Sequence, residues 1–144
     1  MKHTVVHYID SKEFGGAEQM VFTILKGMAR HKWKIVLIYH PHVGLSRFIE
    51  KVNELDVSTV CLPEIKNWRD ISGFIRFIRK LRHIKPSVFH AHLPWHLRCT
   101  FGILCAFCAR VPAIIATLHA YQENLGRKEL FIQKILSILV DRYI

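Results

Sequence analysis

The sequence contains no uninterrupted apolar stretch of 18 residues, although 51% of its 144 residues are hydrophobic. Arg98, Arg110 and Pro112 bracket the longest apolar segment, whereas a transmembrane helix needs about 20 consecutive apolar residues. A membrane-spanning chain is therefore not expected. The length suits one packed domain over residues 1–144, with no room for a second full domain.

Cysteines are few, and nothing resembling a secretory signal precedes them. This combination predicts a cytoplasmic protein with free thiols rather than a disulfide framework. Cys105 and Cys108 have the C-x-x-C spacing of redox and zinc sites, but no second pair accompanies them at zinc spacing. Because they lie in an apolar helical run, we interpret them as buried thiols.

Acidic residues are also scarce, with 11 against 21 lysines and arginines and a formal charge of +10. Anionic partners are therefore expected, such as phosphorylated substrates or anionic lipid. The chain lacks the patterns of helix-turn-helix, zinc-finger and RNA-binding modules, so we expect no nucleic-acid partner. Basic residues cluster between Arg69 and His83, and this helix face is either simply solvated or a peripheral contact with an anionic membrane.

Short β-rich runs alternate with amphipathic helical patterns along the whole chain. The strand candidates are residues 4–9, 35–39, 57–62, 88–91 and 113–117, followed by an approach to a sixth strand at 140–144. The helix candidates begin near Ala17, Leu45, Ile71, His96 and Lys128. Such alternation with short connections predicts an α/β fold, a Rossmann-like doubly wound parallel sheet in a single domain.

The first predicted strand ends in the turn Phe14-Gly15-Gly16-Ala17-Glu18, which opens a helix. The turn matches neither G-x-G-x-x-G nor the P-loop, so neither a dinucleotide site nor a P-loop is supported. Glycines there still permit sharp backbone conformations and close approach of a ligand, and a helix N-terminus favours anions. A diphosphate is one candidate ligand, and an ordinary strand-to-helix turn is the alternative.

Histidines follow two other predicted strands, His92 after the fourth and His119 after the fifth. Ligands of doubly wound sheets bind outside the carboxyl ends of the strands, where strand order reverses. In a sheet ordered 3-2-1-4-5, the glycine turn and both histidines would line one crevice. His90, His92 and His96 could instead share a metal ion, but no carboxylate stands near them in sequence, so no metal is expected.

Three stretches together resemble the N-terminal domain of a family 4 glycosyltransferase of the GT-B architecture. They are Ile9–Glu18, Lys85–Trp95 and Val111–His119. The resemblance implies a retaining enzyme that moves a sugar from a nucleotide-diphosphate sugar to a glycan, a lipid-linked or an envelope acceptor. It implies that Gly15 and Gly16 approach the donor diphosphate and that His119 is the catalytic histidine facing the transferred sugar. Glu18, His92 and Trp95 would line the cleft on the acceptor side, and no cofactor is expected.

The resemblance also implies a second half. In the family, most donor contacts come from a C-terminal domain with two glutamates separated by seven residues, a pair that this sequence lacks. We therefore expect a domain truncated before its donor-binding partner, inactive alone, and completed by a C-terminal domain or a partner chain. The alternative is a non-catalytic binding or regulatory module, or the remnant of a truncated enzyme. Such a module would dock through apolar residues of the last helix, namely Phe131, Ile132, Ile135, Leu136, Leu139 and Val140.

Overall fold

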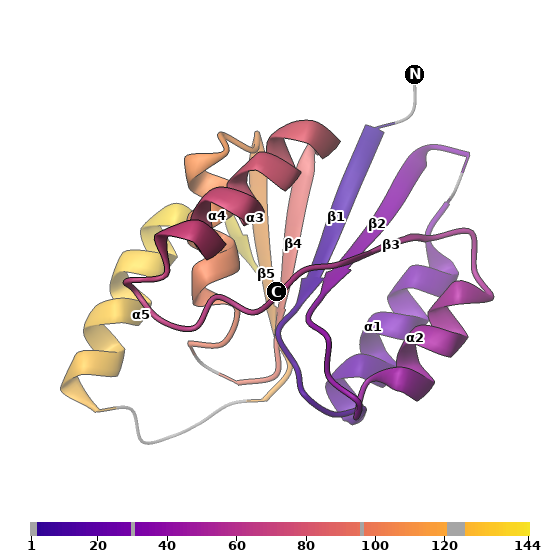
Figure 1. The fold of residues 1–144 in the computed structure, drawn as a ribbon, viewed down its shortest axis with the longest axis horizontal. Coiled ribbons are helices and arrows are strands. Elements are labelled where there is room, and N and C mark those ends of the chain that lie inside the picture. The colour runs from indigo at the N-terminus through magenta and orange to yellow at the C-terminus, as the bar shows by residue number, and fades with distance from the viewer. Residues whose placement is uncertain (1–2, 30, 96, 121–125) are drawn as a thin grey trace.

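The computed structural model describes residues 3–29, 31–95, 97–120 and 126–144. Six parallel strands form one sheet in the order β3-β2-β1-β4-β5-β6 (Figure 1). The strands are β1 (His3–Ile9), β2 (Trp33–Tyr39), β3 (Ser58–Cys61), β4 (Val88–Leu93), β5 (Ala113–Leu118) and β6 (Arg142–Tyr143). The helices are α1 (Gly16–Gly27), α2 (Ser46–Asn53), α3 (Ile71–Ile84), α4 (Thr100–Cys108) and α5 (Arg127–Leu139). The predicted fold class and strand order are confirmed.

Alternation along β1 divides the core between the two faces of the sheet. Val5 and Ile9 pack with residues of α1 and α2, whereas Val6 and Tyr8 pack with residues of α3, α4 and α5. Figure 1 shows the same division, with α1 and α2 on one side and the other three helices together on the opposite side. The sheet is therefore covered on both faces, as a doubly wound fold requires.

Helix α4 begins at Thr100, four residues later than predicted. Leu97 and Cys99 have positive φ angles of 65° and 62°, which lie outside the right-handed helical region. An apolar periodicity cannot reveal such a backbone conformation. His96, the predicted start, lies outside the described residues, as does most of the loop from Tyr121 to Gly126.

Two glycines allow segments to approach closely. A Cβ on Gly102 of α4 would lie 2.1 Å from Cε1 of Tyr8, so only glycine lets α4 sit this near β1. A Cβ on Gly44 would lie 2.5 Å from the carbonyl oxygen of Lys12. The amide of Phe14 donates to the carbonyl of Gly44 at 3.1 Å. The loop before α2 therefore holds the glycine turn in place.

All four cysteines are free thiols, as predicted. Cys105 is buried, but Cys108 is exposed, so the interpretation of both as buried is half wrong. The two positions lie three residues apart on α4, and only one of them points into the helix layer. Within the part of the chain that the structure describes, no helix is both long and apolar enough to cross a membrane.

Candidate functional site

A cavity of about 670 Å³ opens at the carboxyl ends of β1, β4 and β5. Three segments that are distant in sequence line it: residues 11–18 with Met20, the β4 exit with Pro94, Trp95 and Arg98, and His119 with Ala120. Five of the six predicted site residues therefore line one cavity: Gly15, Gly16, Glu18, Trp95 and His119. The sixth, His92, does not.

The N-terminus of α1 forms one wall of this cavity. Gly15 is the N-cap, and its amide donates to Oε2 of Glu18 at 2.8 Å. This hydrogen bond caps the helix, so Glu18, predicted as a cleft residue, also has a structural role. The residue is only 4% exposed. The amides of the first turn, from Gly16 on, have no carbonyl partner within the helix and carry its positive dipole end. This wall suits an anionic group.

The two glycines contribute to this wall through their lack of a side chain rather than through a positive-φ backbone conformation. Among the described residues no glycine has a positive φ, and Gly15 is extended at φ −134°. A Cβ on Gly16 would meet no atom within 4 Å, and the residue lines the cavity. The missing side chain therefore leaves space in which a ligand can reach the helix amides.

His119 lies on the cavity wall formed by the β5 exit. Its amide donates to the carbonyl of Leu93 at 2.9 Å, which ties it to the end of β4. Burial lowers the pKa of His119, and the carboxylate of Glu18 partly opposes this effect. The imidazole is therefore neutral at pH 7, and a neutral imidazole can donate one hydrogen bond and accept another.

His92 lies behind His119 rather than in the cavity. It is 1% exposed, and its Nδ1 lies 3.3 Å from Nε2 of His119. Because β4 continues to Leu93, His92 is a strand residue, and its side chain projects from a face of the sheet rather than from a loop. The structure thus gives His92 contact with the predicted catalytic histidine but not with the cavity, unlike the acceptor-side position expected from sequence.

His92 also belongs to a histidine cluster that the sequence only partly suggests. One ring nitrogen of each of His7, His90 and His92 lies within 4.8 Å of the others. The spacing along the chain suggests His90 and His92 with His96, and His96 lies outside the described residues. No local pattern points to His7, because the register that places His7 beside His90 joins residues far apart in the chain.

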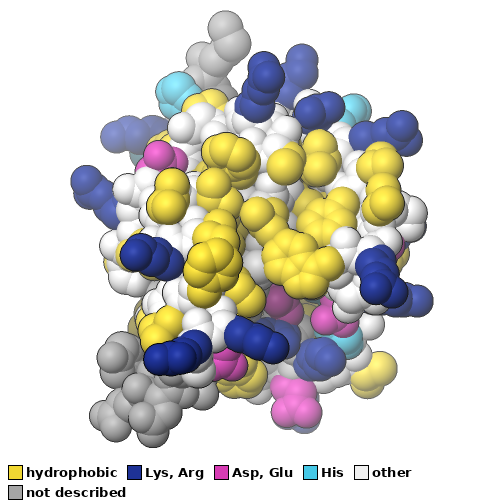
Figure 2. All heavy atoms as spheres, turned by 90° about the vertical axis from the view of Figure 1, so that its left-hand side faces the viewer, with side chains coloured by type: hydrophobic (Ala, Val, Ile, Leu, Met, Phe, Trp, Pro, Cys, Tyr) yellow, Lys and Arg dark blue, Asp and Glu magenta, His cyan; other side chains and the backbone are white. Residues whose placement is uncertain are grey.

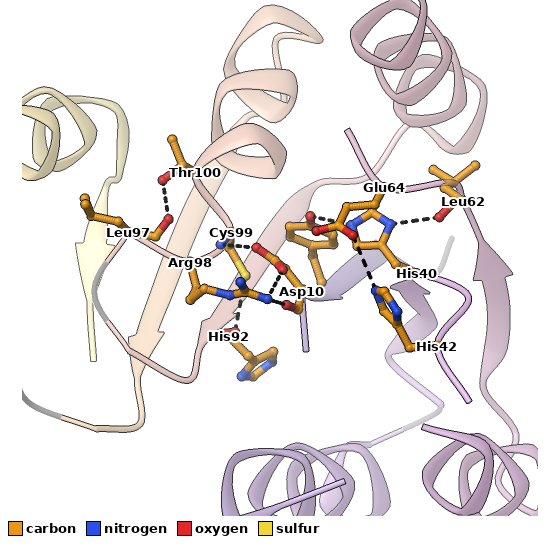
Figure 3. Close-up of polar contacts among 11 residues, drawn as sticks. Asp10, His40, His42, Leu62, Glu64, His92, Leu97, Arg98, Cys99 and Thr100 are labelled. Atoms are coloured by element: carbon orange, nitrogen blue, oxygen red, sulfur yellow. Dashed lines mark hydrogen bonds and ion pairs between the residues drawn. The ribbon is translucent and has the colours of Figure 1, made fainter. Parts of the chain in front are cut away.

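An ion pair that sequence reasoning missed stands beside the cavity (Figure 3). Nη2 of Arg98 lies 2.6 Å from Oδ1 of Asp10 and also donates to the Asp10 carbonyl. Oδ2 of Asp10 accepts the amide of Cys99 at 2.9 Å. Burial raises the pKa of Asp10, while the Cys99 amide and the Arg98 guanidinium lower it. The only signal in the sequence is that Asp10 directly follows the first strand.

Arg98 also contacts the exposed ring of Trp95. Its guanidinium carbon lies 5.9 Å from the ring centroid, and Trp95 is 54% exposed beside the cavity. Nε of Arg98 is buried and has no hydrogen-bond partner among the described residues. The cavity therefore combines helix amides, a guanidinium, an exposed indole and a neutral imidazole, a set suited to an anionic ligand with a polar ring.

A second polar network anchors the loop that begins at His40 (Figure 3). Nδ1 of His40 donates to the carbonyl of Leu62 at 2.8 Å, which leaves Nε2 to accept the hydroxyl of Tyr8 at 2.9 Å. His42 then lies 3.5 Å from Glu64. These contacts fix the loop that supports the glycine turn, and they lie outside the main cavity.

Comparison with known proteins identifies the family of the chain. The family model described as Glycosyltransferase Family 4 matches residues 14–144. The chain belongs to this family. No curated protein matches the chain significantly.

Among solved structures, this family 4 domain resembles the HepE protein of Anabaena, crystallised in complex with UDP and glucose. The TM-score is 0.66 at 14% sequence identity, over 92% of this chain and 35% of that one. At this identity the likeness shows the fold. It confirms the predicted Rossmann-like α/β fold, whereas the family match is what confirms the resemblance to a family 4 glycosyltransferase domain. The chain spans about a third of the length of HepE.

Proposed function

We propose that this family 4 domain is the N-terminal half of a retaining glycosyltransferase that uses a nucleotide-diphosphate sugar. The observation that carries the proposal is the cavity in which the α1 N-terminus faces the same space as His119. The family assignment and the UDP and glucose bound by HepE support a nucleotide-sugar donor. The acceptor is a glycan or a lipid-linked or envelope saccharide.

In the proposed reaction, Gly15 and Gly16 let the leaving diphosphate approach the first turn of α1, and the free amides from Gly16 on stabilise the charge that develops on it. Arg98 and Lys12, which line the same cavity, add positive charge there. His119 donates a hydrogen bond to a hydroxyl of the transferred sugar. Trp95 offers an apolar ring face on which a sugar can pack, so it lines the acceptor side with Glu18 nearby.

We propose that catalysis needs a second α/β half, in the same polypeptide or in a partner chain. The cavity is open, and this chain covers about a third of the HepE length. The alternative, a binding module without catalysis, draws support from exposed apolar residues of α5, among them Phe131 and Ile138. Other residues named for that docking face, Leu136 and Val140, are instead buried in the core.

A peripheral contact with an anionic membrane is part of the proposal. Exposed apolar side chains lie over α3, α5 and the segment before α3, and we call them the apolar face: Trp68, Ile71, Ile75, Phe131, Ile135 and Ile138. Figure 2 shows apolar side chains gathered on this side of the molecule, with lysine and arginine around them. Such a pattern suits insertion between lipid headgroups with charge attraction at the rim.

The test measures release of nucleoside diphosphate from a panel of nucleotide sugars, with an added saccharide or water as the acceptor of the sugar. The chain is assayed alone and together with a family 4 C-terminal half that carries the glutamate pair. We expect release only from the combination, and His119→Ala to lower it by about 100-fold or more. Gly16→Val places a side chain in the cavity and is expected to raise the KM for the donor. His83→Ala, on the exposed side of α3, is the control.

Two results contradict the proposal. Robust turnover by the chain alone would refute the need for a second half. Release that is unchanged in both His119→Ala and Gly16→Val would show that this cavity does not hold the donor. Absence of release from the combination as well would favour the binding-module alternative.

A further inference from the structure

Three imidazoles from adjacent strands meet on the face of the sheet that carries α1. His7 of β1 pairs in register with His90 of β4, and His92 lies two residues further along β4 on the same face. His7 and His92 are each 1% exposed, and His90 is partly buried. The arrangement is held by strand pairing, so it is as rigid as the sheet itself.

The ring nitrogens lie at separations that suit one shared ion. His7 Nδ1 lies 2.8 Å from His92 Nε2, and one nitrogen of each of the three rings lies within 4.8 Å of the others. A tetrahedral zinc ion with bonds of about 2.0–2.1 Å needs ligand nitrogens about 3.3 Å apart. The observed separations bracket that value, so small side-chain rotations bring the three nitrogens to one ion.

Each ring also has a partner outside the trio. A metal-bound histidine usually donates its other ring N–H to such a partner, which fixes its orientation. These outer contacts are His7 Nε2 to Met28 Sδ at 3.1 Å, His92 Nδ1 to His119 Nε2 at 3.3 Å, and His90 Nε2 to Thr117 Oγ1 at 2.7 Å. They leave His7 Nδ1 and His92 Nε2 for the ion, and His90 supplies the third nitrogen.

We propose that His7, His90 and His92 form a binding site for one divalent transition-metal ion, with Zn²⁺ as the best fit. Imidazole is a preferred ligand of zinc, and three imidazoles leave a fourth position for water. The site lies outside the cavity of the proposed function, and its existence does not depend on sugar transfer. From the sequence, His90, His92 and His96 are the candidate ligands and no metal is expected. The proposed site has His7 in place of His96 and revises that expectation.

The site also connects to the cavity through His92. With Nε2 on the ion, His92 keeps its proton on Nδ1 and donates it to Nε2 of His119. Without the ion, Nε2 of His92 donates to His7 Nδ1 when His7 donates to the thioether of Met28. Metal binding is thus expected to move the proton of His119 from one ring nitrogen to the other.

The test titrates Zn²⁺ into the full 144-residue chain in competition with a chromophoric chelator, and Co²⁺ in parallel by visible absorption. We expect one ion per chain, and His90→Ala to weaken binding at least about 100-fold, beyond the effect of losing an outer partner. Thr117→Val removes such a partner and should weaken binding about tenfold. His42→Ala is the matched control, because His42 beside Glu64 is a histidine site away from the cluster.

The proposal is overturned if the wild-type chain binds Zn²⁺ no more tightly than His90→Ala does. It is also overturned if His42→Ala loses Zn²⁺ binding. Near-ultraviolet circular dichroism checks that each variant is folded. If His90→Ala does not fold, NMR of the wild-type chain with Co²⁺ decides. Paramagnetic shifts of the ring protons of the three cluster histidines support the site, and shifts confined to His3 or His42 refute it.

Discussion

The Asp10–Arg98 pair determines how the exit of β4 meets the end of β1. Replacing Arg98 by methionine leaves the Asp10 carboxylate, 18% exposed, with only the Cys99 amide as partner among the contacts above. We expect the free energy of unfolding at pH 7 to fall by about 1–3 kcal/mol, since partial exposure moderates the cost of breaking a buried pair. Urea unfolding measures this. The double variant with Asp10→Asn should lose less than the sum of the single losses.

The same variant has a defined pH dependence. The Arg98 guanidinium lowers the pKa of Asp10, so its removal raises that pKa further above the usual value. The folded state then binds a proton at a higher pH than the unfolded chain does, which favours folding as the pH falls. The stability gap between Arg98→Met and wild type should therefore narrow from pH 7 toward pH 5. A constant gap would show that the ion pair contributes nothing specific.

At the level of single residues, sequence reasoning found the groups that follow strands but not their partners. His119 directly follows β5, Gly15 and Gly16 lie in the connection between β1 and α1, and sheet topology alone brings them together. Arg98 meets Asp10 across 88 positions, and no local pattern encodes such a contact. His7 was missed for the same reason, because a histidine inside an apolar strand reads locally as a core residue.

Among the elements, the packing of α4 on β1 depends on one missing side chain. Gly102→Ala would place a methyl group 2.1 Å from the Tyr8 ring, which is 2% exposed and cannot move aside freely. We expect a loss of about 1–3 kcal/mol of unfolding free energy, as for other overpacked cores. Gly27→Ala at the end of α1 meets no atom within 4 Å and should instead stabilise by about 0.5–1 kcal/mol. Equal effects in urea unfolding would contradict this packing argument.

Element boundaries were predictable where a local signal marks them. The start of α3 follows from Asn67–Asp70, and the structure has Asp70 as its N-cap, accepting the amide of Gly73 at 3.0 Å. The start of α4 has no such signal. It is set by the positive φ of Leu97 and Cys99 and by the contact of the Cys99 amide with Asp10. That contact is tertiary, so periodicity placed the helix start too early.

In the whole molecule, the alternation of strands and helices predicts a parallel, doubly wound sheet, because strand–helix–strand crossovers have one hand. The order of its strands depends on one long step, since β4 follows β3 in sequence but pairs with β1. The distribution of apolar side chains on the outside was less predictable. Periodicity assigned the apolar stripe of α5 to one docking face. The structure divides it, burying Leu136 and Val140 while Phe131 and Ile138 remain 65% and 79% exposed. Only the packing of α5 on α4 and the sheet determines which side faces outward.

The exposed part of this stripe leads to a prediction about how the protein binds lipid vesicles. Helices α3, α4 and α5 form one layer, so the apolar face and the basic residues of α3 lie on the same side of the sheet. Two kinds of variant separate their contributions to vesicle binding. Phe131→Ser with Ile138→Ser removes apolar area, and Arg76→Glu with Arg79→Glu reverses charge. Lys34→Glu with Arg47→Glu is the control, with the same change of net charge placed on β2 and α2.

We expect the chain to sediment with vesicles containing phosphatidylglycerol and much less with pure phosphatidylcholine. Each basic residue near an anionic surface contributes about 1 kcal/mol, so reversal of two should weaken binding by about 30-fold or more. The serine variant should weaken vesicle binding by about the same factor at low and at high salt. The effect of the charge reversal should instead shrink as salt screens the charges. If the control pair weakens binding as much as the α3 pair does, then net charge alone attracts the protein. If the serine variant binds as well as wild type, then the apolar face is not the membrane contact.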